Sequence, residues 1–364
     1  MGQSPDSSSY NENAEGLPFF QGNADFGEIH PTVRIWCNAP TKIVEPGTLL
    51  ISVRAPIGAL NFASERSCIG RGLAGISAKN GVELKYIYYC LKGKHSELNA
   101  KGTGSTFKAI SKSALGETAV KIIPQAEQIE VIQVLDRVSD IIAARKKQIA
   151  ELDNLVKARF VEMFGDPIRN NRNYRQIPLE QLCDVGSSKR IFEKEYVDKG
   201  IPFYRTKEVV ELSKGNEIST ELFITKERFE EIRNKYGVPQ KNDLLISAVG
   251  TIGVIWIVDG ESDFYFKDGN LLRIASSSKF DSVYMKYLLE SLIANYKQQM
   301  SVGTAYAALT IAGLKQMQVY DVPLSLQQEF ATFVAQVDKS KVVVQKALNE
   351  TQMLFDSLMQ EYFG

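Results

Sequence analysis

The feature that most constrains this chain is an internal repeat, in which short segments of the first half return in the same order in the second half. The matching pairs are Leu17–Phe20 and Ile201–Tyr204, Leu49–Ser52 and Leu244–Ser247, Ile57–Gly58 and Ile252–Gly253, Gly104–Phe107 and Gly303–Tyr306, Pro124 and Pro323, Gln128 and Gln327, and Phe164–Gly165 and Phe363–Gly364. Their separation grows at first and is constant from Gly104 onward, so the second copy carries insertions only in its first part. A unit of about 190 residues is too long for a solenoid repeat. We expect two similar domains related by a pseudo-twofold axis, suited to a partner or substrate that is itself two-part.

The composition predicts a globular protein without a membrane-spanning segment. The chain has 364 residues, of which 44% are hydrophobic, enough for one large or two medium cores. No apolar run approaches the ~18 residues that a membrane span needs, and we expect no signal peptide. We therefore expect a cytoplasmic protein with no membrane partner.

Charge and metal-binding residues narrow the classes of function. The 43 Lys and Arg residues balance 43 Asp and Glu residues, so a DNA-binding role needs local basic faces or charge supplied by a partner. Four cysteines without C-x-x-C spacing favour single buried thiols over zinc sites or disulfides. Because His30 and His95 are the only histidines, a multi-histidine metal site is excluded, and we expect no metal site.

Each copy has the pattern of a mixed α/β domain followed by one long helix. Buried strands are predicted over residues 48–54, 57–62, 243–249 and 252–258. Amphipathic helices are predicted over residues 84–91 and 281–299, exposing a tyrosine-rich face that is more often core than a binding platform (Tyr86, Tyr88, Tyr89, Tyr284 and Tyr287).

Two long helices are the strongest local prediction. Residues 125–164 contain no Gly or Pro, and residues 325–362 open with the capping-box pattern Ser325-x-x-Gln328. Both helices carry apolar residues at heptad spacing. The predicted seam consists of Val138, Ile142, Ile149, Leu152, Val156, Val337, Val344, Leu348 and Phe355, with polar interruptions at Arg145, Arg159, Lys341 and Thr351. The two helices most simply pack antiparallel on each other; the alternative is two unrelated core helices.

The predicted fold class is α+β, with two α/β domains joined by two long antiparallel helices that form a coiled coil. The predicted boundaries are 1–123 for the first domain, 124–165 for its helix, 166–322 for the second domain and 323–364 for its helix.

This arrangement resembles the DNA specificity subunit of type I restriction–modification systems. The resemblance rests on motifs spread through both copies, whose order is more specific than any one of them. They are Gly2–Pro5, Leu17–Gly22, Pro46–Gly58, Lys241–Gly253, Pro124–Gln128, Pro323–Gln328, Met163–Pro167 and Glu361–Gly364.

The resemblance implies a function and a set of partners. Each domain would be a target-recognition domain for one half of a bipartite site in double-stranded DNA, and the coiled coil would set the spacer. Two methyltransferase subunits would dock on the chain, and nuclease-translocase subunits would join them. The chain itself would perform no chemistry and hold no cofactor, since S-adenosylmethionine belongs to the methyltransferase.

One departure from the repeat concerns the start of the first copy. The second copy has a lead-in over residues 166–185 that contains a predicted strand, Gln176–Cys183. The first copy has no counterpart, because Met1-Gly2 aligns with Val185-Gly186. The first recognition domain is therefore expected to lack its opening strand.

Candidate DNA-contacting residues are polar side chains that follow the apolar strands or lie in the polar loops of each copy. Forked and amide donors are the groups that recognise base edges and phosphates. The candidates are Gln21, Asn23, Arg54, Lys101, Thr103, Ser105 and Lys108 in the first copy, and Ser187, Lys189, Arg190, Arg205, Lys207, Thr304 and Tyr306 in the second. Each could instead be an ordinary solvated residue, and the Gly104 loop an ordinary helix-start turn. Gln21 is replaced by Arg205 in the repeat, as expected if the copies recognise different half-sites.

Catalytic patterns are missing from the sequence. It contains no N-P-P-[FY], no G-x-G-x-x-G after a strand and no G-x-x-x-x-G-K-[ST]. The main hypothesis is therefore a non-catalytic DNA-sequence-reading scaffold. Two alternatives stay open: a DNA-independent adaptor that binds two copies of a protein, and an enzyme with an unrecognised site.

Overall fold

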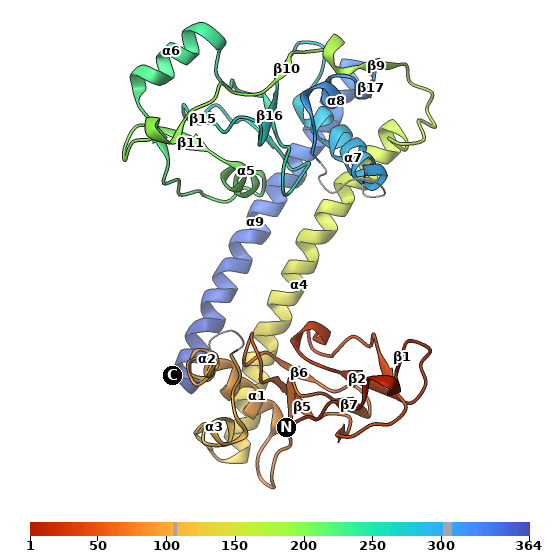
Figure 1. The fold of residues 1–364 in the computed structure, drawn as a ribbon, viewed down its shortest axis with the longest axis vertical. Helices are drawn as coiled ribbons and strands as arrows, with labels where there is room; N and C mark the ends of the chain where they lie inside the picture. Colours follow the sequence, from red (N-terminus) through yellow and green to blue (C-terminus); the bar gives the residue numbers. More distant parts are fainter. Residues whose placement is uncertain (105–107, 301–307) are drawn as a thin grey trace. The chain divides into compact units, whose positions relative to one another are not determined.

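The computed structural model describes residues 1–104, 108–300 and 308–364. The chain divides into two compact units (Figure 1). Unit 1 comprises Met1–Lys147 and Gln345–Gly364, and unit 2 comprises Gln148–Val344. Both long helices cross this division, so each unit contains a part of each. In the described residues, no helix combines the length and apolar character that crossing a membrane requires.

Unit 1 contains two small sheets and three short helices. The strand order is β1-β3-β2-β7-β4 in one sheet and β6-β5-β8 in the other. The strands are β1 (Tyr10–Asn11), β2 (Leu17–Phe20), β3 (Trp36–Cys37), β4 (Ile43–Val44), β5 (Leu49–Ser52), β6 (Leu60–Phe62), β7 (Ser67–Ile69) and β8 (Leu73–Ile76). The short helices are α1 (Leu84–Gly93), α2 (His95–Ala100) and α3 (Lys112–Gly116).

Unit 2 is built on the same plan with additional elements. Its sheets have the orders β10-β16-β13-β14, β12-β11-β15 and β17-β9. The strands are β9 (Gln176–Pro178), β10 (Val185–Gly186), β11 (Ile201–Tyr204), β12 (Phe223–Ile224), β13 (Leu244–Ser247), β14 (Ile255–Ile257), β15 (Tyr265–Phe266), β16 (Leu271–Ile274) and β17 (Gln318–Tyr320). Its helices are α5 (Thr206–Ser213), α6 (Lys226–Tyr236), α7 (Ser282–Met300) and α8 (Ile311–Lys315).

The sequence repeat is also a repeat of strand pairing. In unit 1, β2 runs parallel to β7 and antiparallel to β3. In unit 2, β11 likewise runs parallel to β15 and antiparallel to β12. β5 lies between β6 and β8, as β13 lies between β14 and β16. The core strands β5 and β13 are buried on both faces, which explains their continuous apolar sequences. Helices α5 and α6 lie between β11 and β13, where the growing separation predicts insertions.

The lead-in of unit 2 forms a strand at an edge of that unit. β9 pairs antiparallel with β17, with Ile177 opposite Val319. The strand is shorter than predicted, because the chain turns into a single 3-10 turn at Leu179–Gln181. In unit 1, residues 119–121 occupy the position of β17 in the repeat, and no strand is assigned to them.

A buried glutamine near the start of each long helix connects that helix to its domain. Gln128 is fully buried; its Oε1 accepts from Glu83 N at 2.8 Å, and its Nε2 donates to Ile123 O at 2.7 Å. Gln327, 2% exposed, repeats these bonds with Asp281 N and Val322 O, both at 2.8 Å. Each side chain thus joins the start of α1 or α7 to the segment entering the long helix. We call this arrangement the glutamine latch.

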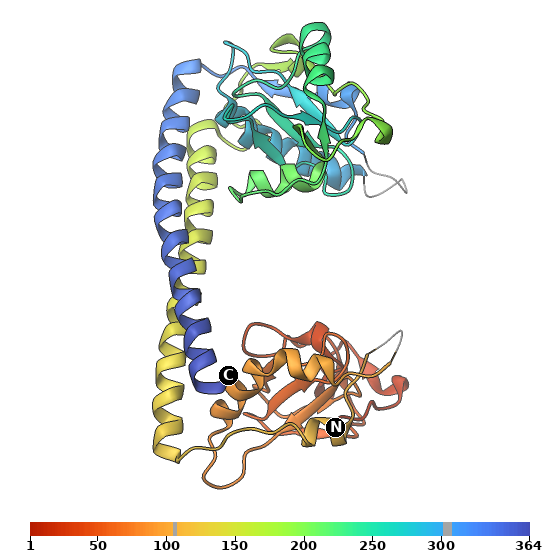
Figure 2. The same cartoon turned by 90° about the vertical axis from the view of Figure 1, so that its left-hand side faces the viewer.

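The long helices α4 (Gln125–Phe164) and α9 (Leu324–Phe363) have the bounds that the sequence predicts to within a residue. They pack antiparallel within each unit (Figure 2). In unit 1, Arg145 NH1 donates to Ala347 O and Thr351 Oγ1. In unit 2, Lys341 Nζ lies 2.6 Å from Asp153 Oδ1. The predicted polar interruptions therefore bridge the two helices.

The predicted seam residues of these helices are all at least partly shielded from solvent. Within the described residues they are buried or half-buried: Val138, Ile142, Val156, Val337, Leu348 and Phe355 are buried, and Ile149, Leu152 and Val344 are half-buried.

One local prediction is wrong and another is confirmed. The capping box is not formed, because α9 begins at Leu324 and Ser325 lies inside its first turn. The tyrosine-rich face belongs to the core, the reading that the sequence analysis favours. Tyr86, Tyr89 and Tyr284 are at most 2% exposed, because α1 and α7 turn this face toward the long helices.

Replacing a latch glutamine by leucine should destabilise the protein. The Gln128→Leu and Gln327→Leu variants leave a buried N–H and a buried carbonyl unpaired, so each should lower the free energy of unfolding by about 3 kcal/mol. Chemical denaturation would measure the change. Gln125→Leu and Gln328→Leu are the matched controls, because both side chains are exposed, and should change it by less than ~0.5 kcal/mol. Equal losses in latch and control variants would contradict the assigned role.

Candidate DNA interface

A polar cleft in unit 1 lies where strands from its two sheets end. The turn Gly70–Gly72 connects β7 of one sheet to β8 of the other. Gly72 N donates to Gln21 O after β2, and Gly72 O accepts from Val53 N after β5. A Cβ on Gly72 would lie 2.3 Å from Gln21 O, so only glycine allows this approach. The chain segments that follow β2 and β5 are thereby held on either side of one turn.

The cleft between these segments has a volume of about 770 Å³, and we call it the recognition cleft. Its lining includes three of the side chains that the sequence predicts as DNA contacts, Gln21, Asn23 and Arg54. Gln21 and Arg54 are exposed at its surface. The cleft therefore gathers donors that are distant in the sequence, as recognition of base edges requires.

Two arginines of the recognition cleft were missed by the sequence analysis. Arg34 precedes β3 and pairs with the carboxylate of Asp25, which is 8% exposed. Arg71 lies in the Gly70–Gly72 turn and is exposed. The sequence could have pointed to Arg71, because it is a basic residue between two glycines that separate two apolar strands. It could not have pointed to Arg34, because the second copy has neither an arginine at the position of Arg34 nor an aspartate at the position of Asp25.

The other predicted contacts of unit 1 are distributed around the cleft. Ala55 N donates to Lys108 O, and Arg54 forms an isolated bridge with Ala109, so residues 108–109 lie beside Arg54. Thr103 pairs with Ala109 through its backbone. Lys101 Nζ is occupied by Glu97, at 2.8 Å, and by the Thr118 hydroxyl, so it supports α2. Ser105 lies outside the described residues, as do Thr304 and Tyr306 of unit 2.

In unit 2 most of the predicted donors have partners within the unit. Ser187 Oγ donates to Leu271 O at 2.8 Å, and Lys189 Nζ lies 4.4 Å from the centre of the Tyr236 ring. Arg190 pairs with Asp268 at 2.8 Å and lines a second concavity of about 620 Å³. Lys207 is exposed on α5.

Arg205 directly follows β11 and is held by Glu208. The NH2 of Arg205 lies 2.8 Å from Glu208 Oε1, and its backbone N–H donates to Oε2 at 2.8 Å. Burial raises the pKa of the Glu208 carboxyl, but the hydrogen bonds from Arg205 outweigh it, so the pKa lies below its ordinary value. Glu208 is therefore charged at neutral pH and fixes the arginine.

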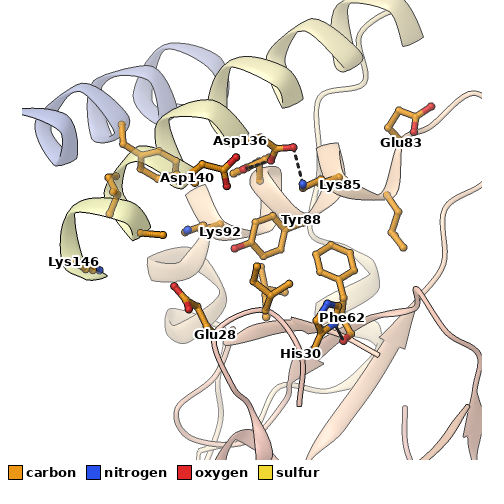
Figure 3. Close-up of a pocket in the computed structure, with 18 of the residues that line it drawn as sticks. Glu28, His30, Phe62, Glu83, Lys85, Tyr88, Lys92, Asp136, Asp140 and Lys146 are labelled. Carbon is orange, nitrogen blue, oxygen red and sulfur yellow. Dashed lines mark hydrogen bonds and ion pairs between the residues drawn. The ribbon is translucent and has the colours of Figure 1, made fainter. Parts of the chain in front are cut away.

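A larger groove of about 890 Å³ in unit 1 is lined by the 28–30 segment, β6, α1 and the long helices (Figure 3). Asp136 of α4 accepts from Lys85 Nζ and Tyr89 OH of α1, both at 2.6 Å. Lys92 lies over the rings of Tyr88 and Phe355, and burial lowers the pKa of its amine. These contacts fix α1 to the long helices.

The described residues contain no cluster of three or more His, Cys, Asp or Glu side chains that could hold a metal ion. Three of the four thiols, Cys37, Cys68 and Cys90, are buried, as the sequence predicts. The recognition cleft instead combines hydrogen-bond donors with three arginines and two carboxylates, those of Glu12 and Asp25.

The comparisons with known proteins agree with this arrangement. A family model described as type I restriction modification DNA specificity domain matches residues 2–154 and again residues 171–351. The type I restriction enzyme MjaIX specificity subunit of Methanocaldococcus jannaschii is 24% identical over 92% of this chain and 80% of its own length. The MjaX specificity subunit of the same organism is 41% identical, over 43% of this chain and 37% of its own length.

Solved structures share the fold. The S subunit of a type I restriction–modification system from M. genitalium matches over 100% of this chain and 92% of its own, with a TM-score of 0.55 and 16% identity. A chain from a study of type I complex assembly and conformational transition matches over 99% and 93%, with a TM-score of 0.58 and 14% identity. Because the family model covers both copies of the repeat and most of the chain, the protein belongs to the family of type I restriction–modification DNA specificity subunits and carries two copies of the specificity domain.

Proposed function

We propose that the two units recognise the two halves of a bipartite site in double-stranded DNA, and that the α4–α9 coiled coil sets the spacer between them. The observation that carries this proposal is the recognition cleft. It places Gln21, Arg34, Arg54 and Arg71 around one opening, and these are the donor types that recognise base edges and phosphates. The zero net charge of the chain is compatible with this role, because the positive charge of the cleft is local.

The protein would act in the cytoplasm as a subunit without catalytic function, in a complex whose methyltransferase subunits hold S-adenosylmethionine. Exposed apolar residues on the long helices support docking of two such subunits, with nuclease-translocase subunits joining the complex. Leu155 in unit 2 and Leu354 in unit 1 are equivalent in the repeat and are 48% and 51% exposed. Other exposed apolar residues of α9 are Val342 and Val343 in unit 2 and Met353 in unit 1. An exposed leucine at equivalent positions of the two copies is what a protein that binds two copies of one partner would present.

The proposed function predicts a split methylation motif in cells. A genome-wide map of N6-methyladenine, with the methyltransferase subunit expressed throughout, should show a bipartite motif methylated on both strands only when this chain is present. Methylation that does not depend on the chain, or a contiguous motif, would contradict the proposal. A methyltransferase that binds the chain but acquires no DNA preference would instead indicate an adaptor.

Arg54 and Arg71 should contribute phosphate contacts. In the methyltransferase complex, Arg54→Ala and Arg71→Ala should each weaken binding to a duplex carrying the mapped motif. Each should also reduce the slope of log affinity against log salt by about 0.9, since one released counterion is lost. Anisotropy titrations at several salt concentrations would measure both effects. Arg66→Ala is the control, because Arg66 is exposed and pairs with Glu45 outside the cleft; a slope change equal to that of the cleft variants would argue for a nonspecific charge effect.

Leu155→Glu and Leu354→Glu should each remove one methyltransferase subunit. Native mass spectrometry should show two bound subunits for the unaltered chain, one for each single variant and none for the double variant. Because both leucines are about half exposed, the charge should leave the fold intact. Asn154→Glu and Asn349→Glu introduce the same charge at exposed polar positions of the two units and should retain both subunits. Loss of both subunits from one single variant would show that the docking surfaces are not independent.

A further inference from the structure

The two units share an arrangement that the sequence repeat does not reveal: a buried carboxylate that binds an exposed arginine. In unit 1, Asp25 is 8% exposed, and the Arg34 side chain that it binds is 55% exposed. In unit 2, Glu208 is 2% exposed, and the Arg205 side chain is 40% exposed.

Both carboxylates occupy the same place in the fold. Asp25 Oδ2 accepts from Gln21 N at 2.7 Å, and Gln21 is the first residue after β2. Glu208 Oε2 accepts from Arg205 N at 2.8 Å, and Arg205 is the first residue after β11. The strands themselves correspond in detail. Phe20 O accepts from Gly70 N, and Tyr204 O accepts from Lys267 N, each at 2.8 Å.

The arginines come from different places in the chain. Arg205 directly follows its strand, whereas Arg34 lies in the segment that returns to β3. The residue in unit 1 that corresponds to Arg205 is Gln21. The two units therefore use arginines from different sequence positions to place a guanidinium on a buried carboxylate at the equivalent place in the fold. If each carboxylate only capped its own local turn, no arginine would be required there.

The geometry leaves one edge of each guanidinium available. Arg34 binds Asp25 through Nε, at 3.2 Å, and NH2. Arg205 binds Glu208 through the same two nitrogens, at 3.4 Å for Nε and 2.8 Å for NH2. Among the described residues, the NH1 of neither arginine has a protein partner. A guanidinium fixed in this way still presents the edge that carries NH1 to a ligand. The paired N–H donors of arginine fit the O6 and N7 acceptors of guanine.

We propose that Arg34 and Arg205 are specificity-determining residues, one for each half-site, and that each contacts a guanine in an orientation set by its buried carboxylate. This inference rests on the proposed function, because it names the base that each unit recognises. Asp25 and Glu208 are then positioning residues. Ordering the side chains before DNA binds reduces the entropy lost on binding.

The test measures the activity of each protein variant on each of a set of modified DNA duplexes. The methyltransferase complex would be assayed on duplexes carrying the mapped motif, in which each guanine in turn is replaced by 7-deazaguanine, which lacks the N7 acceptor. One guanine in each half-site should be sensitive, with methylation slowed roughly 5-fold or more, the lower end of the range for a bidentate arginine–guanine contact, because the O6 acceptor remains. With Arg34→Gln the sensitivity of one half-site should disappear and that of the other should remain. Arg205→Gln should give the reverse pattern.

Two controls keep the result interpretable. Arg66→Gln changes an exposed arginine outside the cleft and should leave both sensitivities in place. Folding should survive Arg34→Gln, because Asp25 still accepts from the backbone of Gln21 and Gly22. Asp25→Asn and Glu208→Gln should reduce the same sensitivities while retaining the arginines.

Each remaining outcome has a defined meaning. If both arginine variants keep the sensitivity profile of the unaltered complex, the arginines are structural; the inference is overturned, and the proposed function stands. Half-sites without a sensitive guanine lead to the same conclusion. If the unaltered complex shows no split motif, the proposed function and the inference both fail.

Discussion

The buried glutamine at the start of each long helix is the interaction on which the two units depend. A glutamine side chain carries a donor and an acceptor, so Gln128 and Gln327 can each bind two backbone groups that packing removes from water. The groups that they bind belong to the segment entering the long helix and to the start of α1 or α7. An apolar residue of the same size would fill the space and leave both groups unpaired, at a cost that increases with burial. The position of each helix is therefore fixed by hydrogen bonds as well as by apolar packing.

The recognition cleft shows how one backbone plan can carry different surfaces. The Gly70–Gly72 turn of unit 1 corresponds to Lys267–Asn270 in unit 2, and Arg54 corresponds to Val249. The backbone bonds from these segments to the strands are kept, while the outward side chains change in charge. In unit 2 the corresponding turn carries Lys267 and Asp268, and Asp268 is bound by Arg190.

Much of the fold can be predicted from the sequence, because apolar patterns report burial directly. Continuous apolar runs identify β5 and β13, and long stretches without Gly or Pro at heptad spacing identify α4 and α9. The tyrosine-rich face of α1 could be expected in the core from its composition, but an isolated helix does not show that this side meets α4. Gln21, Asn23 and Arg54, which line the recognition cleft, could be singled out because they follow strands that recur; their contact with DNA stays a prediction. Arg34 could not be singled out, because its position depends on a buried aspartate within a segment that the repeat does not preserve.

The contact of Arg145 with Thr351 and Ala347 has a consequence for how the long helices can evolve. A heptad added to α4 alone would displace this guanidinium from its carbonyl and hydroxyl, leaving a partly buried charge against apolar residues. A heptad added to both helices at facing positions would keep the contact. Changes in helix length that preserve the contact should therefore occur in α4 and α9 together. The two insertions would lie far apart in the gene and would have to be selected as a pair.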